Sequence, residues 1–95
     1  MAKFHIEVHH EEDKVSCAKA IRVFNETGSH YLMNADWGCM DGVHSSWMMV
    51  DADSKEEAKS IVPPAYRSQS SVVQLNKFNF AEAEKANKQH AKSKS

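Results

Sequence analysis

The chain has few of the features that mark a specialised class of protein. Its 95 residues include only two cysteines, Cys17 and Cys39, too few for the disulfide framework of a small secreted domain. No apolar run is long enough to span a membrane. The first residues, MAKFHIEVHHEED, lack the apolar stretch and cleavage site of a secretory signal. We therefore expect a cytoplasmic protein with no membrane partner.

Basic charge is not concentrated either. Residues 1–80 carry 8 lysines and arginines against 11 aspartates and glutamates, whereas residues 81–95 carry 4 lysines against 2 glutamates. A nucleic-acid partner is not expected, because it would require a concentrated basic face. With 41% hydrophobic and 26% charged residues, the composition is that of one globular domain. We place this domain at residues 1–80 and expect a basic C-terminal tail over residues 81–95, partly helical or disordered.

Four segments have the composition and period of strands. KFHIEVHH alternates apolar and polar side chains, and SHYLMNADW, VHSSWMMVDA and SSVVQLNKF are also predicted to be strands. Between the second and third lies GCMDG, which has glycine at both ends and predicts a hairpin loop.

Two segments have the period of helices. EEDKVSCAKAIRVFNETG carries an apolar stripe that includes Cys17, which we expect to be a small buried thiol. Gly28 is placed to end this helix. DADSKEEAKSIV opens with Ser54 and Glu57 at the spacing of a capping box, in which each side chain accepts a hydrogen bond from the other's backbone N–H. The prolines that follow stop this second helix.

The element order is therefore β-α-β-β-α-β, which predicts an α+β, ferredoxin-like fold. Right-handed crossovers give a four-stranded antiparallel sheet of order 4-1-3-2, with both helices on one face. The first and third strands are then neighbours, and the other face of the sheet is uncovered.

The stretch HYLMNADWGCMDGVH contains two histidines and a cysteine. If residues 30–37 form a strand of the hairpin, His30 and His44 lie on the order of 20 Å apart, too far to share one metal ion. The sheet order instead brings the end of the first strand to the hairpin loop. It predicts a transition-metal site for Zn, Ni, Cu or Co, because imidazole, thiolate and carboxylate groups meet there. The predicted ligands are His9, His10, Asp36, Cys39 and His44.

The face to which each strand residue points is left open by the sequence. Val50 and Ala52 indicate that even-numbered residues of the third strand face the helices, which pairs His44 with His10. The opposite parity pairs His44 with His9. On the first alternative, the uncovered face carries aromatic and polar side chains that can bind a small ligand. The predicted ligand-binding residues are Trp37, Trp47, His5 and Glu7.

The uncovered face also predicts self-association, since large exposed apolar patches usually mark interfaces and symmetric dimers are the commonest assemblies. The stretch HSSWMMVDADSKEEAKSIVPPAYRSQSSVVQLNKF, together with the element order, resembles the dimeric α+β-barrel superfamily of ferredoxin-like domains. The resemblance covers about residues 3–80 and implies a homodimer packed through the open sheet faces. That superfamily includes small monooxygenases, muconolactone-isomerase-like enzymes, stress-response proteins and nickel-binding proteins. No catalytic motif carries over residue by residue.

Three functions are open at this point. The first is a small homodimeric protein that binds a small ligand or a transition metal. The second is a small cofactor-independent enzyme, monooxygenase- or isomerase-like, with a pocket under the open sheet face. His44 or His9 would be its base, with Cys39 or Asp36 as a neighbour. The third is a non-enzymatic assembly module.

Overall fold

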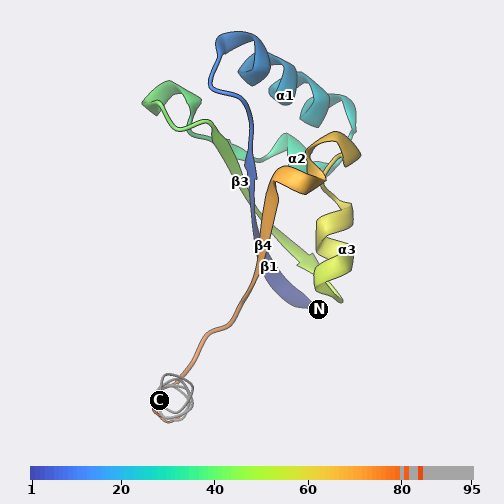
Figure 1. Ribbon diagram of the computed structural model, residues 1–95. Coiled ribbons are helices and arrows are strands. Elements are labelled where there is room, and N and C mark those ends of the chain that lie inside the picture. Colours follow the sequence, from blue (N-terminus) through green and yellow to red (C-terminus); the bar gives the residue numbers. More distant parts are fainter. Residues whose placement is uncertain (80, 82–83, 85–95) are drawn as a thin grey trace.

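The computed structural model of the chain describes residues 1–79, 81 and 84 (Figure 1). The predicted tail over residues 81–95 therefore lies almost entirely outside the described residues. Within the described part of the chain, no helix is both long and apolar enough to cross a membrane. The elements are, in order, β1 (Ala2–His9), α1 (Lys14–Glu26), α2 (His30–Met33), β2 (Asp36–Trp37), the 3₁₀ helix η1 (Cys39–Asp41), β3 (Ser45–Ala52), α3 (Lys55–Ser60), the 3₁₀ helix η2 (Pro64–Gln69) and β4 (Ser70–Leu75).

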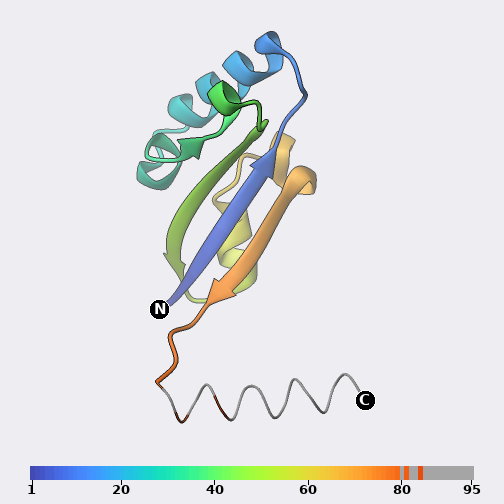
Figure 2. The same cartoon turned by 90° about the vertical axis from the view of Figure 1, so that its left-hand side faces the viewer.

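The four strands form one antiparallel sheet of order β2-β3-β1-β4, which confirms the predicted order read from the other end. β1 lies between β3 and β4 and pairs with both along most of its length (Figure 2). The register pairs Ala2 with Ala52 and His9 with Ser45. The α+β class and the ferredoxin-like arrangement of a four-stranded sheet with helices packed on it are therefore as predicted.

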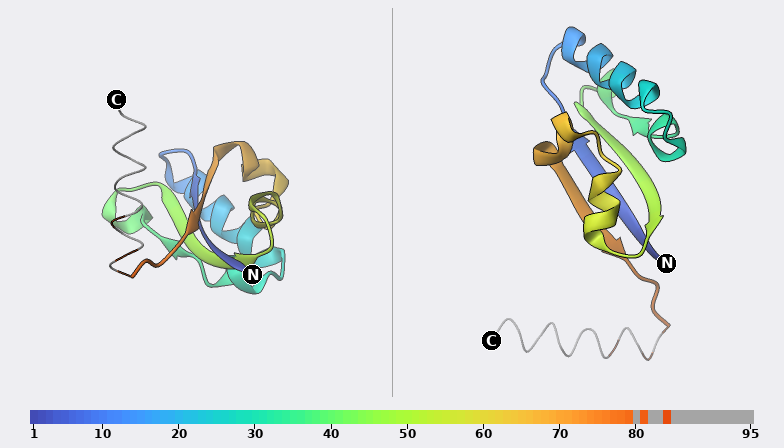
Figure 3. Two further views of the ribbon diagram at one scale, coloured as in Figure 1. Left: turned by 90° about the horizontal axis from the view of Figure 1, so that it is seen from below. Right: turned by 90° about the vertical axis from the view of Figure 1, so that its right-hand side faces the viewer.

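The core lies on one face of this sheet. On β1, Phe4, Ile6 and Val8 are buried, and they meet Ala20 and Phe24 of α1 in a single apolar cluster. A phenylalanine, isoleucine or valine side chain contributes about 1.5–3 kcal/mol when it is fully withdrawn from water. The helices therefore lie on the same side of the sheet (Figure 3).

The parity of β3 follows from its burial pattern. Met48, Val50 and Ala52 are buried against the helices, whereas Met49 is 48% exposed. Even-numbered residues of β3 thus face the helices, and Trp47 lies with Met49 on the uncovered side. The first of the two alternatives left open by the sequence is the one found.

The first helix begins and ends as its sequence indicates. Asp13 is the N-cap of α1, and its carboxylate accepts hydrogen bonds from the backbone N–H and the hydroxyl of Ser16. These bonds hold the pKa of Asp13 below its ordinary value. Gly28 follows the helix with φ of 74°, a left-handed conformation that favours glycine.

The prediction of one strand over residues 30–37 is wrong. The structure has the short helix α2 there, and only Asp36 and Trp37 pair with β3. Ser29 caps α2, since its hydroxyl accepts from the N–H of Leu32, and Leu32 is buried in the core. The alternation of polar and apolar residues was too short to distinguish a strand from one helical turn.

The hairpin between β2 and β3 is real but shorter than predicted. Its loop contains the single turn η1 and closes at Gly42, whose φ is 80°. Backbone bonds from Gly38 N–H to the Ser45 carbonyl and from Val43 N–H to the Gly38 carbonyl hold it together. The loop that carries Cys39 is therefore fixed at the end of the sheet.

The helix predicted after the third strand, α3, is capped almost as predicted. The Ser54 hydroxyl of α3 accepts from the Glu57 N–H, but the Glu57 carboxylate accepts from the N–H of Asp53, one residue before the cap. The helix ends before Pro63 and Pro64, which lead into η2.

Gly38 is a position at which the hairpin has no room for a side chain. A Cβ atom there would lie 2.8 Å from two ring carbons of Trp47 and 2.8 Å from the carbonyl oxygen of Val43. We predict that Gly38→Ala lowers the free energy of unfolding by about 1–3 kcal/mol, because overpacking forces the loop to shift. Urea unfolding measures the effect. Met40→Ala is the control, since Met40 is fully exposed, and equal stability of both variants would contradict the prediction.

Candidate metal centre

Three side chains meet where β1 and β3 end beside the hairpin loop. His10 directly follows β1, Cys39 begins η1, and His44 directly precedes β3. The backbone N–H of His10 donates to the carbonyl oxygen of His44 at 3.1 Å, so the β1–β3 pairing continues one step past the last residue of β1. The sheet itself therefore fixes the positions of the two histidines.

The ligand atoms of this group are close enough to share an ion. His10, Cys39 and His44 each offer one donor atom, and all three donor atoms lie within 4.8 Å of one another. The Nε2 atom of His10 is 3.1 Å from the Sγ atom of Cys39. The two imidazole rings meet edge to face, with centroids 5.5 Å apart and planes at 84°. Within the described residues, this is the one group of three or more such side chains that can hold a metal ion.

The surroundings favour the neutral form of His10. Its side chain is buried, 8% exposed, and its ring lies 5.9 Å from that of Trp37. Burial lowers the pKa of His10 below its ordinary value of 6.5, and repulsion from His44 lowers it further, while Asp13 acts in the opposite direction. A neutral imidazole is the form that binds a metal ion.

His44 has an unsatisfied nitrogen. Its Nδ1 atom is buried and has no hydrogen-bond partner within the described part of the chain. A buried polar atom without a partner costs roughly 1–3 kcal/mol, so such atoms in folded proteins usually have a reason. A bound cation near the two imidazoles is one such reason.

Cys39 also has a covalent partner. The structure pairs it with Cys17 of α1 in a disulfide, and no cysteine is free. The expectation that Cys17 is an isolated buried thiol is therefore wrong. A disulfide sulfur carries no thiolate charge, so it is a poor metal ligand. The complete group of two imidazoles and a thiolate exists only when this disulfide is reduced.

Two of the predicted ligands do not join the group. His9 points to the uncovered face, where its Nδ1 atom is 2.6 Å from the Ser45 hydroxyl and its Nε2 atom is 3.4 Å from the Glu7 carboxylate. Asp36 is exposed on β2 and pairs with Trp47 across the hairpin. The structure thus brings together His10, Cys39 and His44 out of the five predicted residues.

The predicted ligand-binding residues are divided between the two faces. His5 and Trp47 line a surface hollow of about 270 Å³ on the uncovered face, and Glu7 is on the same side, opposite Trp47 in the register. Trp37 lies on the helix side, where its ring is 5.0 Å from that of Phe24.

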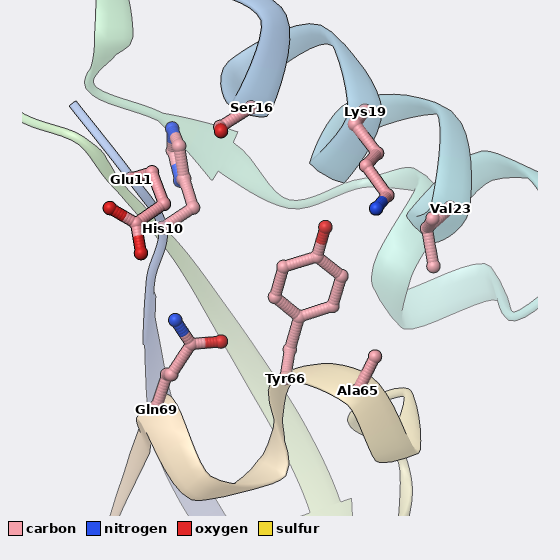
Figure 4. A pocket seen from close by; sticks show the side chains of 8 residues that line it. All are labelled: His10, Glu11, Ser16, Lys19, Val23, Ala65, Tyr66 and Gln69. Carbon is pink, nitrogen blue, oxygen red and sulfur yellow. The ribbon is translucent and has the colours of Figure 1, made fainter. Parts of the chain in front are cut away.

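A pocket of about 240 Å³ opens beside His10 on the helix side (Figure 4). The Tyr66 side chain points from η2 toward Ser16 and Lys19 of α1, and Glu11 and Gln69 line the same space. Sequence reasoning missed this pocket, because its walls come from two stretches far apart in the chain, residues 10–23 and residues 65–69. His10 is the one member of the candidate metal group among its lining residues.

Comparisons of the chain with protein-family models, with curated proteins and with solved structures found no match. Functional inference therefore depends on the geometry of the site alone.

The lowered pKa of His10 predicts a pH dependence of stability in the absence of metal. The unfolded chain takes up the proton of this residue near pH 6.5, whereas the folded chain takes it up only at lower pH. The stability is therefore fully present above pH 6.5 and falls as the pH drops toward the pKa of His10 in the folded state. We predict that His10→Gln loses part of this acid sensitivity, as measured by urea unfolding between pH 7.5 and 5 with a chelator present.

His30→Gln is the matched control, because His30 is exposed on α2 and outside the group. The prediction fails if both variants keep the wild-type dependence on pH.

Proposed function

We propose that the protein binds a transition-metal ion, of the class Zn, Ni, Cu or Co, through His10, Cys39 and His44. The observation that carries this proposal is the convergence of three donor atoms within 4.8 Å. A cytoplasmic location would support it, since cytosolic thiols are kept reduced.

The donor set suits a borderline-soft cation. Zinc binds imidazole nitrogen at about 2.0–2.1 Å and thiolate sulfur at about 2.3 Å, so tetrahedral donors lie roughly 3.3–3.8 Å apart. The 3.1 Å separation of His10 Nε2 and Cys39 Sγ is already near this range. The donor atom of His44 lies within 4.8 Å of the other two, so it would have to move closer by about 1 Å at most to reach this range. The ion would also give the buried His44 imidazole a partner.

Three protein ligands leave one position of a tetrahedral ion to be filled, by a fourth protein ligand in structural sites and by water or substrate in catalytic sites. Sites of three protein ligands and one open position bind water or a substrate. The pocket beside His10 borders the centre and carries the Lys19 ammonium group and the Tyr66 phenol (Figure 4). A small anion bound by these two groups would lie beside the centre, at a site apart from the predicted ligand-binding residues Trp37, Trp47, His5 and Glu7.

The expected result is one metal ion per chain when the protein is reduced and supplied with zinc or cobalt(II). His44→Gln is expected to weaken binding more than about tenfold, because even the loss of a residue that only supports a ligand costs about 10–100-fold. Equilibrium dialysis with metal analysis of protein without a histidine tag measures both.

His30→Gln again provides the control and is expected to bind like the wild type, since His30 contacts Asn34 and Tyr31 rather than the group. Reduced wild-type protein without stoichiometric metal would overturn the proposed function.

We also propose that the protein is a homodimer packed through the uncovered sheet face. Met49 and Val73 flank His5 in the register and are 48% and 53% exposed, and Leu75 extends the apolar area. Along β1 this face carries Lys3, His5 and Glu7 in order. A two-fold axis through His5 would place each lysine opposite the glutamate of the second copy, so the charges are self-complementary.

A charge placed on this face tests the dimer. Val73→Glu is expected to reduce the mass measured by light scattering to that of a monomer, because two buried carboxylates would face each other or lie in apolar surroundings. Val15→Glu is the matched control, since Val15 is 78% exposed on α1. A wild-type monomer, or a Val73→Glu dimer as stable as that of the control, would contradict the proposal.

A further inference from the structure

We propose that Cys17 is the fourth ligand of the metal centre, and that its disulfide with Cys39 and the bound metal are mutually exclusive states of the same four side chains. The inference rests on the proposed function and extends it to a ligand from α1 and to regulation by thiol oxidation.

The disulfide places the sulfur of Cys17 beside the centre, although Cys17 is not one of the three side chains whose donor atoms all lie within 4.8 Å of one another. Its bond partner, Cys39 Sγ, lies 3.1 Å from His10 Nε2 and within 4.8 Å of a His44 nitrogen. Reduction of the disulfide leaves the thiols of Cys17 and Cys39 next to the two histidines. That is a Cys₂His₂ donor set, one of the standard sets of tetrahedral zinc.

The order of the ligands in the chain agrees with this assignment. They form two local pairs, His10 with Cys17 across the start of α1 and Cys39 with His44 across η1. Each pair is held by its own backbone structure. The Asp13 cap fixes the first turn of α1, and the η1 turn and Gly42 fix the hairpin loop. Only the side chains need to turn when the sulfurs separate to make room for the ion.

The charges also balance. Zinc carries two positive charges, and two thiolates neutralise them, whereas Cys39 alone would leave one positive charge in a partly buried position. Asp36, the one carboxylate among the predicted ligands, does not join the group. Cys17 therefore supplies the second negative charge that the site otherwise lacks.

The conversion between the two states is a two-electron reaction. A dithiol reductant transfers two electrons and two protons to the disulfide, gives two cysteine thiols and becomes a disulfide itself. Zinc binding then displaces both thiol protons. In the reverse direction, hydrogen peroxide takes two electrons from the two thiolates and, with two protons, becomes two water molecules. The thiolates form the disulfide, and the zinc ion is set free. Oxidation thus releases the metal.

Cobalt(II) tests the assignment, because its thiolate charge-transfer absorption reports the number of bound sulfurs. In reduced protein, Cys17→Ser is expected to lose about half of this absorption and to bind more than about tenfold more weakly. Cys39→Ser is expected to lose a similar share, since Cys17 and both histidines remain. If Cys17 is not a ligand, Cys17→Ser keeps the full absorption and Cys39→Ser loses all of it.

X-ray absorption of zinc-loaded wild-type protein provides a second measurement that needs no variant. Two sulfurs at about 2.3 Å are expected, and a single sulfur would overturn the assignment of Cys17. A reduced wild-type protein that binds neither ion would instead overturn the proposed function, so the two failures are distinguishable.

The redox coupling has its own test. Peroxide added to zinc-loaded wild-type protein is expected to release one zinc ion for every two thiols lost, measured with a chromogenic chelator and a thiol titration. Cys17→Ser, which cannot form the intramolecular disulfide, is the control and is expected to release zinc more slowly. Thiol loss without zinc release in the wild type would contradict the exclusive states.

Discussion

The antiparallel pairing of β1 with β3 is the constraint on which the rest of the structure depends. It joins the two longest strands over eight residue pairs and ends with His9 opposite Ser45. The additional bond from the His10 N–H to the His44 carbonyl extends this pairing by one step. Without that register, two histidines more than thirty positions apart in the chain would not lie together at one end of the sheet. The candidate centre is therefore a direct consequence of the sheet topology.

Much of this arrangement could be predicted from the sequence, because it follows from periods and crossovers. The alternation in β1 and the stripe in α1 indicate the layers, and crossover handedness gives the strand order. The pairing of His10 with His44 required the parity of β3 as well, which the buried Val50 and Ala52 settle. Residues 30–37 were misassigned, because the local alternation there competed with the cap at Ser29.

The contact between Cys17 and Cys39 could not be predicted in this way. It depends on how α1 crosses the sheet, and that is set by packing of large side chains, not by period. Phe24 lies between Trp37 of the hairpin and Tyr66 of η2, with ring centroids 5.0 and 5.9 Å away. The disulfide shows that the first turn of α1 lies beside the hairpin loop, and the local period does not encode the tilt of α1 that brings it there. A free buried cysteine and a cross-linked one have the same sequence signature until that tilt is known.

The two chemical states proposed for the centre would cross-link the same parts of the fold. The disulfide closes a loop between residues 22 positions apart, an entropic stabilisation of about 3 kcal/mol in a chain with a small core. A metal bound by all four side chains would tie α1, the end of β1 and the hairpin together in the reduced protein. The fold would thus exchange one cross-link for another, whereas the reduced protein without metal would have neither. Because only that form lacks a tie between α1 and the hairpin, metal binding and disulfide formation would each be coupled to the packing of α1 on the sheet.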